Sequence, residues 1–220
     1  MNVKQLLTTC VLMSGFAVSG AVLAGKITPA LTSLDVMHNG EKVTITRTDD
    51  DNAVIPDAYL KTSRACPPFC VQPMAVVPGV ETVCELEVMG YLKRNADGDR
   101  SVMVVDSRSP EWISRGTIPG SVNIPWNKIN VDMAGTFAIE AEADTLTDIL
   151  TDQFGAKLDN GKWDFRNAKT IVLFCNGIWC PQSSVNIKTL TKLGYPAYKI
   201  KWYRGGMQDW VSVGLTTTKP

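Results

Sequence analysis

The chain has 220 residues, 45% of them hydrophobic, which is enough to bury one substantial core and excludes a disordered or fibrous protein. Its 22 basic and 22 acidic residues balance, without a block of like charge. Nucleic acids and anionic membrane surfaces attract clustered positive charge, so the composition argues against either partner. With a single histidine, zinc sites of the Cys/His type and Cys-His dyads have almost no ligands, and we expect no metal or other cofactor.

The first 24 residues have the pattern of a secretory signal peptide. Lys4 precedes an uncharged stretch from Gln5 to Leu23, and Val22-Leu23-Ala24 places small or apolar residues at the cleavage position. We expect cleavage after Ala24 and export, to the periplasm, with no membrane contact afterwards. The alternative is a retained anchor, because the apolar stretch has about the minimum spanning length, although it is rich in Ser, Thr and Gly.

Cleavage would remove Cys10 and leave the other cysteines in a compartment that oxidises thiols. Their number is then odd, so at least one stays unpaired within the chain. Cys66 and Cys70 lie close together in the sequence, and a disulfide that closes a very small loop is the simplest interpretation. A redox role, or a crosslink to another loop, is the alternative.

Residues 25–79 are expected to form an N-terminal extension of the main domain. Ser33 to Thr48 alternate polar and apolar residues around Asn39-Gly40, a pair that tolerates the positive φ of a tight turn, so we predict a β-hairpin there. His38 beside the turn is expected to be exposed and without a chemical role. From Lys61 to Val80, four prolines forbid a regular helix and predict an extended strap laid over the following domain.

Residues 80–217 are expected to form that domain. We predict a helix from Glu81 to Arg94 with an apolar face, on which Cys84 would be a small packed side chain. Its apolar positions are Val83, Leu86, Met89 and Leu92.

Uninterrupted apolar runs at Val102–Val105 and Thr170–Phe174 are typical of strands buried on both faces of a parallel sheet, and Ala197–Tyr203 has the composition of a further strand. Helical stretches at Ala143–Phe154 and Pro181–Leu193 alternate with them, while residues 155–168, which contain Asn160-Gly161, read as a turn-rich insertion. This alternation predicts an α/β domain of three layers that binds ligands at the carboxyl ends of its strands.

Cys175 follows one of these buried strands and begins a short loop. The loop continues as Asn176-Gly177-Ile178-Trp179-Cys180, after which Pro181 stands at its preferred position at a helix start. Successive backbone N–H groups of such a loop can converge on one point, where the helix start adds partial positive charge. A thiolate or persulfide at Cys175 would be stabilised there without a neighbouring base.

Several motifs in this order resemble the rhodanese family. They comprise Asp106-Ser107-Arg108, Glu111, residues 116–125 (GTIPGSVNIP), Cys175 at its strand end, Leu193-Gly194-Tyr195, residues 205–210 (GGMQDW) and Gly214-Leu215. The resemblance implies a central parallel sheet flanked by helices. It also implies that Cys175 accepts sulfane sulfur from a small sulfur-containing anion such as thiosulfate and passes it to a thiol or cyanide.

The chain departs from the family pattern in its loop. The family's loop usually ends near an arginine, whereas here the loop is about two residues longer and Gln182 stands near the arginine's place. Arg108 and Arg204 are the nearest substitutes by motif position, and an anchoring role is the alternative for both. Thr117 stands where a histidine is common.

Cys180, within the same loop, permits a second chemistry. It either resolves an oxidised or persulfidated Cys175 to a disulfide, which a thioredoxin-like partner would reduce, or packs beneath the loop without reacting. Trp179 either shields the site from water or packs on the strap. The hypotheses are therefore a sulfurtransferase, a thiol-disulfide oxidoreductase or redox sensor, and a non-catalytic rhodanese-like binding module.

Overall fold

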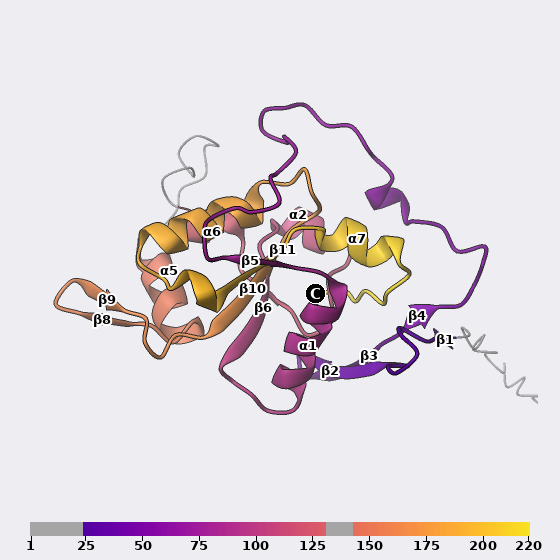
Figure 1. Cartoon of the computed structure of the whole chain (residues 1–220), viewed down its shortest axis with the longest axis horizontal. Coiled ribbons are helices and arrows are strands. Elements are labelled where there is room, and N and C mark those ends of the chain that lie inside the picture. The colour runs from indigo at the N-terminus through magenta and orange to yellow at the C-terminus, as the bar shows by residue number, and fades with distance from the viewer. Residues whose placement is uncertain (1–23, 131–142) are drawn as a thin grey trace, which may run out of the picture.

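The computed structural model describes residues 24–130 and 143–220, so the expected signal peptide lies outside the described residues except for Ala24. Five parallel strands form the central sheet in the order β5-β11-β10-β6-β7. Figure 1 shows this sheet at the centre of the molecule, between helices. They are β5 (Glu81–Val83), β6 (Val102–Asp106), β7 (Val122–Asn123), β10 (Thr170–Phe174) and β11 (Ile200–Tyr203). The predicted α/β fold with a central parallel sheet is confirmed.

Successive side chains of β10 point to opposite faces of the sheet, as in any strand. Val172 and Phe174 pack in a core with α1 (Glu85–Ala96) and α7 (Gly206–Ser212). Ile171 and Leu173 pack in a second core. That core is completed by α3 (Trp126–Ile129), α5 (Ala143–Asp148), the π-helical turn η3 (Ile149–Gln153) and α6 (Gln182–Lys192). An apolar run without alternation is required because both faces are buried.

The predicted N-terminal hairpin is present as β2 (Leu34–His38) and β3 (Glu41–Ile45), with Asn39 and Gly40 both at positive φ. A second antiparallel pair joins β1 (Ala24–Gly25) to β4 (Arg47–Thr48), and the turn η1 (Asp57–Tyr59) follows. The expectation that His38 is exposed is wrong. Its side chain is only 8% exposed and its Nδ1 accepts a hydrogen bond from the Gly120 amide, because the hairpin lies against the main domain.

The predicted helix from Glu81 is also partly wrong. Glu81–Val83 form the edge strand β5, paired with β11, and α1 begins only at Glu85. Cys84 is therefore the residue before the first helical turn and is exposed, rather than packed on a helix. Leu86 is 52% exposed. Val83 belongs to the strand, so its inclusion among the apolar positions of the helix led to a helix start that is too early.

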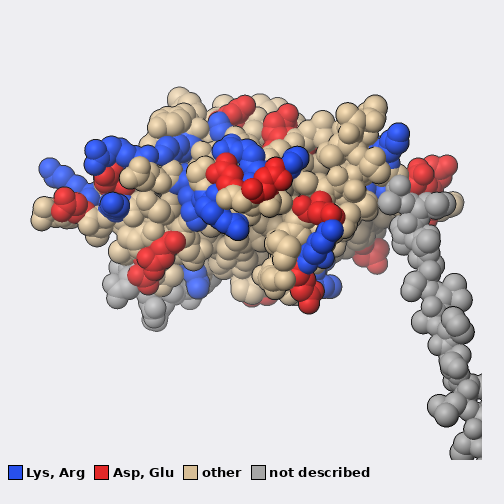
Figure 2. Space-filling view, turned by 90° about the horizontal axis from the view of Figure 1, so that it is seen from below, with Lys and Arg blue, Asp and Glu red and all other residues tan. Residues whose placement is uncertain are grey.

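Residues 155–168 contain a hairpin, β8 (Lys157–Asp159) and β9 (Lys162–Asp164), which turns at Asn160-Gly161. The turn η4 (Ala197–Lys199) precedes β11, and the short helix α2 (Pro110–Ile113) follows β6. Figure 2 shows Lys and Arg side chains intermixed with Asp and Glu on the face seen from below. Among the described residues, no helix is long and apolar enough to cross a membrane.

Candidate functional site

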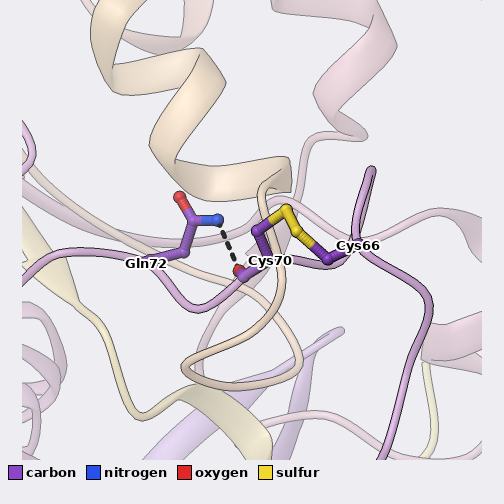
Figure 3. The surroundings of a disulfide bond; sticks show 3 residues. All are labelled: Cys66, Cys70 and Gln72. Atoms are coloured by element: carbon purple, nitrogen blue, oxygen red, sulfur yellow. Dashed lines mark hydrogen bonds between the residues drawn. A yellow bond between two sulfur atoms is a disulfide. The ribbon is translucent and has the colours of Figure 1, made fainter.

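The segment from Lys61 to Val80 runs above the sheet without a helix or strand, as its prolines predict (Figure 1). A disulfide joins Cys66 to Cys70, and the side-chain amide of Gln72 donates to the Cys70 carbonyl over 2.9 Å (Figure 3). The backbone amide of Gln72 donates to the carbonyl of Ile178 over 2.8 Å. This strap, residues 61–80, is thereby joined to the loop that follows β10.

Cys175 stands directly after β10, and its side chain is 2% exposed. The hydroxyl of Ser183, in the first turn of α6, donates to its Sγ over 3.2 Å. Ser183 is positioned in turn by Trp202 on β11, whose indole Nε1 donates to the serine oxygen over 3.1 Å. When protonated, the Cys175 thiol donates to the carbonyl of Cys180 over 3.2 Å. The sulfur thus lies between the carboxyl end of β10 and the start of α6.

Opposing effects set the ionisation of Cys175. Burial alone would raise its pKa, but hydrogen bonds from the Cys180 side chain, from the hydroxyl and amide of Ser183 and from the Gly177 amide hold the pKa at about 7. These donors favour the charged form of the sulfur. Near neutral pH a substantial fraction of Cys175 is thiolate, the nucleophilic form of cysteine.

Cys180 is the opposite case. It is 1% exposed, and burial together with the neighbouring Cys175 sulfur raises its pKa well above the usual range. Its thiol donates to Oε1 of Gln182 over 3.5 Å and accepts a hydrogen bond from the Asn176 side chain over 3.9 Å. The two thiols of the loop therefore differ at neutral pH: Cys175 is partly ionised, whereas Cys180 is protonated.

Trp179 covers this pair and is itself 8% exposed. The ring of Phe69, which lies within the disulfide-closed segment of the strap, meets it edge-on at 5.7 Å between centroids. Its indole nitrogen donates to Oε1 of Gln208 on α7 over 2.9 Å. Trp179 thus both shields the thiols and packs on the strap, so the two roles left open by the sequence occur together.

Close backbone contacts fix the loop and explain two glycines. The Met207 and Gln208 amides donate to the carbonyls of Cys175 and Asn176 over 3.0 and 2.9 Å. Gly206 has a φ of +56°, and a Cβ there would overlap the Cys175 carbonyl. A Cβ at Gly177 would lie 2.8 Å from Oε1 of Gln208.

The other candidate residues serve as anchors. Arg108 is 0% exposed and pairs with Asp106 over 2.6 Å, while it also donates to the Gly116 carbonyl. Thr117 donates to the same Asp106 carboxylate over 2.6 Å. Arg204 donates to two backbone carbonyls of the strap, Gln72 over 2.7 Å and Pro73 over 3.0 Å. Within the described ranges, no group of three metal-ligating side chains occurs.

Sequence reasoning missed three contributors to the site: Ser183, Gln208 and Phe69. Ser183 lies in the first turn of the helix that follows Pro181, where a hydroxyl can face back toward the loop, and this was a usable signal. Gln208 and Phe69 reach Trp179 from distant parts of the chain, so no local pattern marks them.

The geometry can be set beside known proteins. A family model described as a rhodanese-like domain matches residues 89–213, more than half of the chain. No curated protein matches significantly. Among solved structures, a human single-domain sulfurtransferase is 23% identical with a TM-score of 0.38, over 60% of this chain and 96% of that one.

Two further structures are similar to a comparable degree. A protein from Bacillus halodurans is 19% identical with a TM-score of 0.40, over 63% of this chain and 77% of that one. A thiosulfate sulfurtransferase from Pseudomonas aeruginosa is 16% identical with a TM-score of 0.37, over 64% and 20% of the two chains. The match of the family model confirms the resemblance seen in the motifs, and the chain belongs to the rhodanese-like domain family.

Proposed function

We propose that this protein is an exported sulfurtransferase that carries sulfane sulfur as a persulfide on Cys175. The observation that carries the proposal is the Cys175 sulfur itself, held at the end of β10 by the Ser183 hydroxyl and by loop amides, with a pKa of about 7. A thiolate at neutral pH is what nucleophilic sulfur chemistry requires. Export is proposed from the first 24 residues alone.

The proposed reaction has two balanced steps. The Cys175 thiolate attacks the outer sulfur of thiosulfate, a sulfur–sulfur bond forms as that of thiosulfate breaks, and sulfite leaves with the bonding electron pair. A thiolate or cyanide then attacks the outer sulfur of the Cys175 persulfide, which regenerates the Cys175 thiolate. The donors around the thiolate, Ser183 and the Gly177 amide, are placed to stabilise the persulfide anion in the same way.

The burial of Cys175 sets a condition on this proposal. Since the side chain is 2% exposed beneath Trp179 and the strap, a donor reaches it only when this cover moves. Binding and chemistry are then coupled to a local opening of the strap, a motion that needs no change in the sheet.

Mass spectrometry of the mature protein after thiosulfate treatment tests the proposal. We expect the wild type and Cys180→Ser to gain one sulfur atom on the peptide that contains residue 175, and Cys175→Ser to gain none. A gain that survives in Cys175→Ser contradicts the site assignment. No gain in any variant contradicts sulfurtransferase activity and favours a non-catalytic binding module.

A thiol-disulfide activity is a second candidate, favoured by the proximity of the Cys175 and Cys180 thiols, which lie in one buried cluster and influence each other's pKa. In that case Cys180 attacks the inner sulfur of the Cys175 persulfide, the two cysteines form a disulfide, and the outer sulfur leaves as hydrosulfide. A dithiol protein of the thioredoxin kind would reduce the product. Hydrosulfide release and loss of two free thiols after thiosulfate treatment, both abolished in Cys180→Ser, distinguish this reaction from simple transfer.

A further inference from the structure

The loop after β10 contains no basic residue. The two arginines that could replace the family's loop arginine, Arg108 and Arg204, form other contacts in the structure. Arg108 is buried in its pair with Asp106, and Arg204 is bound to strap carbonyls. Asp106 balances the charge of Arg108, so that side chain offers none to an anionic donor. Arg204 keeps its charge, but its Nε and one terminal nitrogen donate to the strap.

Two arginines border the cover of the thiol, each stacked on a tryptophan. The guanidinium carbon of Arg64, in the strap, lies 4.0 Å from the ring centroid of Trp179. That of Arg115, which follows α2, lies 4.5 Å from the ring centroid of Trp112. The two indoles adjoin each other, with 6.3 Å between ring centroids. The positive charges thus flank one continuous aromatic surface that covers the two loop thiols.

The electrostatic surroundings leave these charges available. Neither arginine forms a salt bridge with a carboxylate among the residues that the structure describes, whereas Arg94 and Arg166 each do. Arg64 donates only from one terminal nitrogen to the carbonyls of Lys61 and Ser63. Partial burial lowers the pKa of Arg64, but an arginine remains charged at neutral pH. Glu111 on α2 is the acidic residue closest in sequence to Arg115, and a hydrogen bond with the side chain of Ser109 lowers the pKa of its carboxylate.

We propose that Arg64 and Arg115, stacked on Trp179 and Trp112, form an anion-binding rim that attracts negatively charged sulfur donors to Cys175. The proposal rests on the proposed function and names the residues that select its substrate class. A stacked guanidinium keeps its hydrogen-bond donors directed outward and its charge fixed in place. The strap lies outside the segment that matches the family model, and it contributes one of the two positive charges of this rim, Arg64.

Alkylation of Cys175 by two reagents of similar size tests the rim without requiring sulfur transfer. Iodoacetate is an anion and iodoacetamide is neutral, and both need the same opening of the cover, so their rate ratio isolates charge. In Arg64→Gln/Arg115→Gln we expect the ratio of iodoacetate to iodoacetamide rates at Cys175 to fall about fivefold at low salt. Added salt should lower the wild-type ratio in the same direction.

The chain offers matched controls. Arg94→Gln removes another arginine that lies over an aromatic ring, that of Tyr91, and should leave the ratio at Cys175 unchanged. Arg64→Lys/Arg115→Lys keeps both charges and should retain most of the ratio. The exposed Cys84, whose surroundings include Glu85, Glu87 and Asp209, serves as an internal reference in every variant.

The outcomes separate the rim from the proposed function. An unchanged ratio in the double Gln variant, with Cys175 still alkylated, overturns the rim and leaves the proposed function standing. Failure of both reagents to reach Cys175 in the wild type contradicts both. Under the rim hypothesis, the double Gln variant should also raise the KM for thiosulfate by more than it lowers kcat, since the charges act on the approaching anion.

Discussion

The hydroxyl of Ser183 donates to the sulfur of Cys175 over 3.2 Å while its own oxygen accepts from the indole of Trp202. A buried relay of this kind restrains the direction of the serine proton, because the indole donor occupies one of the two lone pairs of the serine oxygen. The thiolate is thus stabilised by a side chain that the neighbouring strand holds in place.

Removal of this hydroxyl in Ser183→Ala should raise the pKa of Cys175 by about one unit, because a hydrogen bond to the charged form is lost. At pH 7 the fraction of thiolate falls, so alkylation by iodoacetamide slows, whereas the rate at high pH changes little. The pH profile of alkylation measures this shift. Ser184→Ala is the matched control, since Ser184 donates to Gln72 and not to Cys175. An unshifted profile in Ser183→Ala would count against the serine's role.

The cover predicts a second effect. In Cys66→Ser/Cys70→Ser the strap loses the crosslink that encloses Phe69, so Phe69 should hold Trp179 less firmly and Cys175 should open more often. We expect alkylation of Cys175 by iodoacetamide to accelerate severalfold at every pH, with the pKa unchanged. Cys84→Ser, at an exposed position away from the strap, should not change the rate. Equal rates in all three proteins would show that the disulfide does not restrain the cover.

The buried pair of Asp106 and Arg108 should be structural. Asp106→Asn leaves a buried guanidinium without its counter-ion, which costs about 3–5 kcal/mol of unfolding free energy. Asp164→Asn breaks a pair with the same two-residue spacing, that with Arg166, but at the surface, and should change stability little. Urea denaturation of both variants measures the difference. Similar midpoints would show that Asp106 is not an anchor.

A fourth prediction concerns the stability effect of a side chain at Gly206. Gly206→Ala places a methyl group against the Cys175 carbonyl at a positive φ, so we expect a loss of about 2–4 kcal/mol from strain and overlap together. Gly161→Ala also has a positive φ, but no atom lies within 4 Å of the added methyl, and only the conformational cost of about 1 kcal/mol remains. Thermal unfolding compares the two. If they are equally destabilised, the contact with Cys175 has no energetic weight.

The sheet was predictable because its inner strands have a characteristic composition, a short run of apolar residues without alternation. Thr170–Phe174 and Val102–Val105 are apolar on both faces, and only a strand between two helix layers needs that composition. The edge strand β5 was not predictable, because three residues paired on one side carry no pattern of their own. The burial of His38 likewise depends on a contact with Gly120, far away in the sequence.

The position of Cys175 between a buried strand and a helix start was predictable, but its surroundings were only partly so. Asn176 and Gln182 were expected in the loop, and in the structure both side chains form a hydrogen bond with the sulfur of Cys180. The cover formed by Phe69 and Trp179 was beyond local sequence patterns, since it depends on the path of the strap. The position of the thiol in the fold was thus more predictable from the sequence than its access to solvent.

Arg204 has a consequence for how the cover can move. Its guanidinium holds the carbonyls of Gln72 and Pro73, so the strap has a pivot downstream of the disulfide. Residues 61–71, which include Phe69 and the disulfide, lie on the N-terminal side of this anchor, and the rest of the strap leads directly into β5. Changes confined to residues 61–71 can therefore alter the access of reagents to the Cys175 thiol without a change in the packing of the sheet and helices.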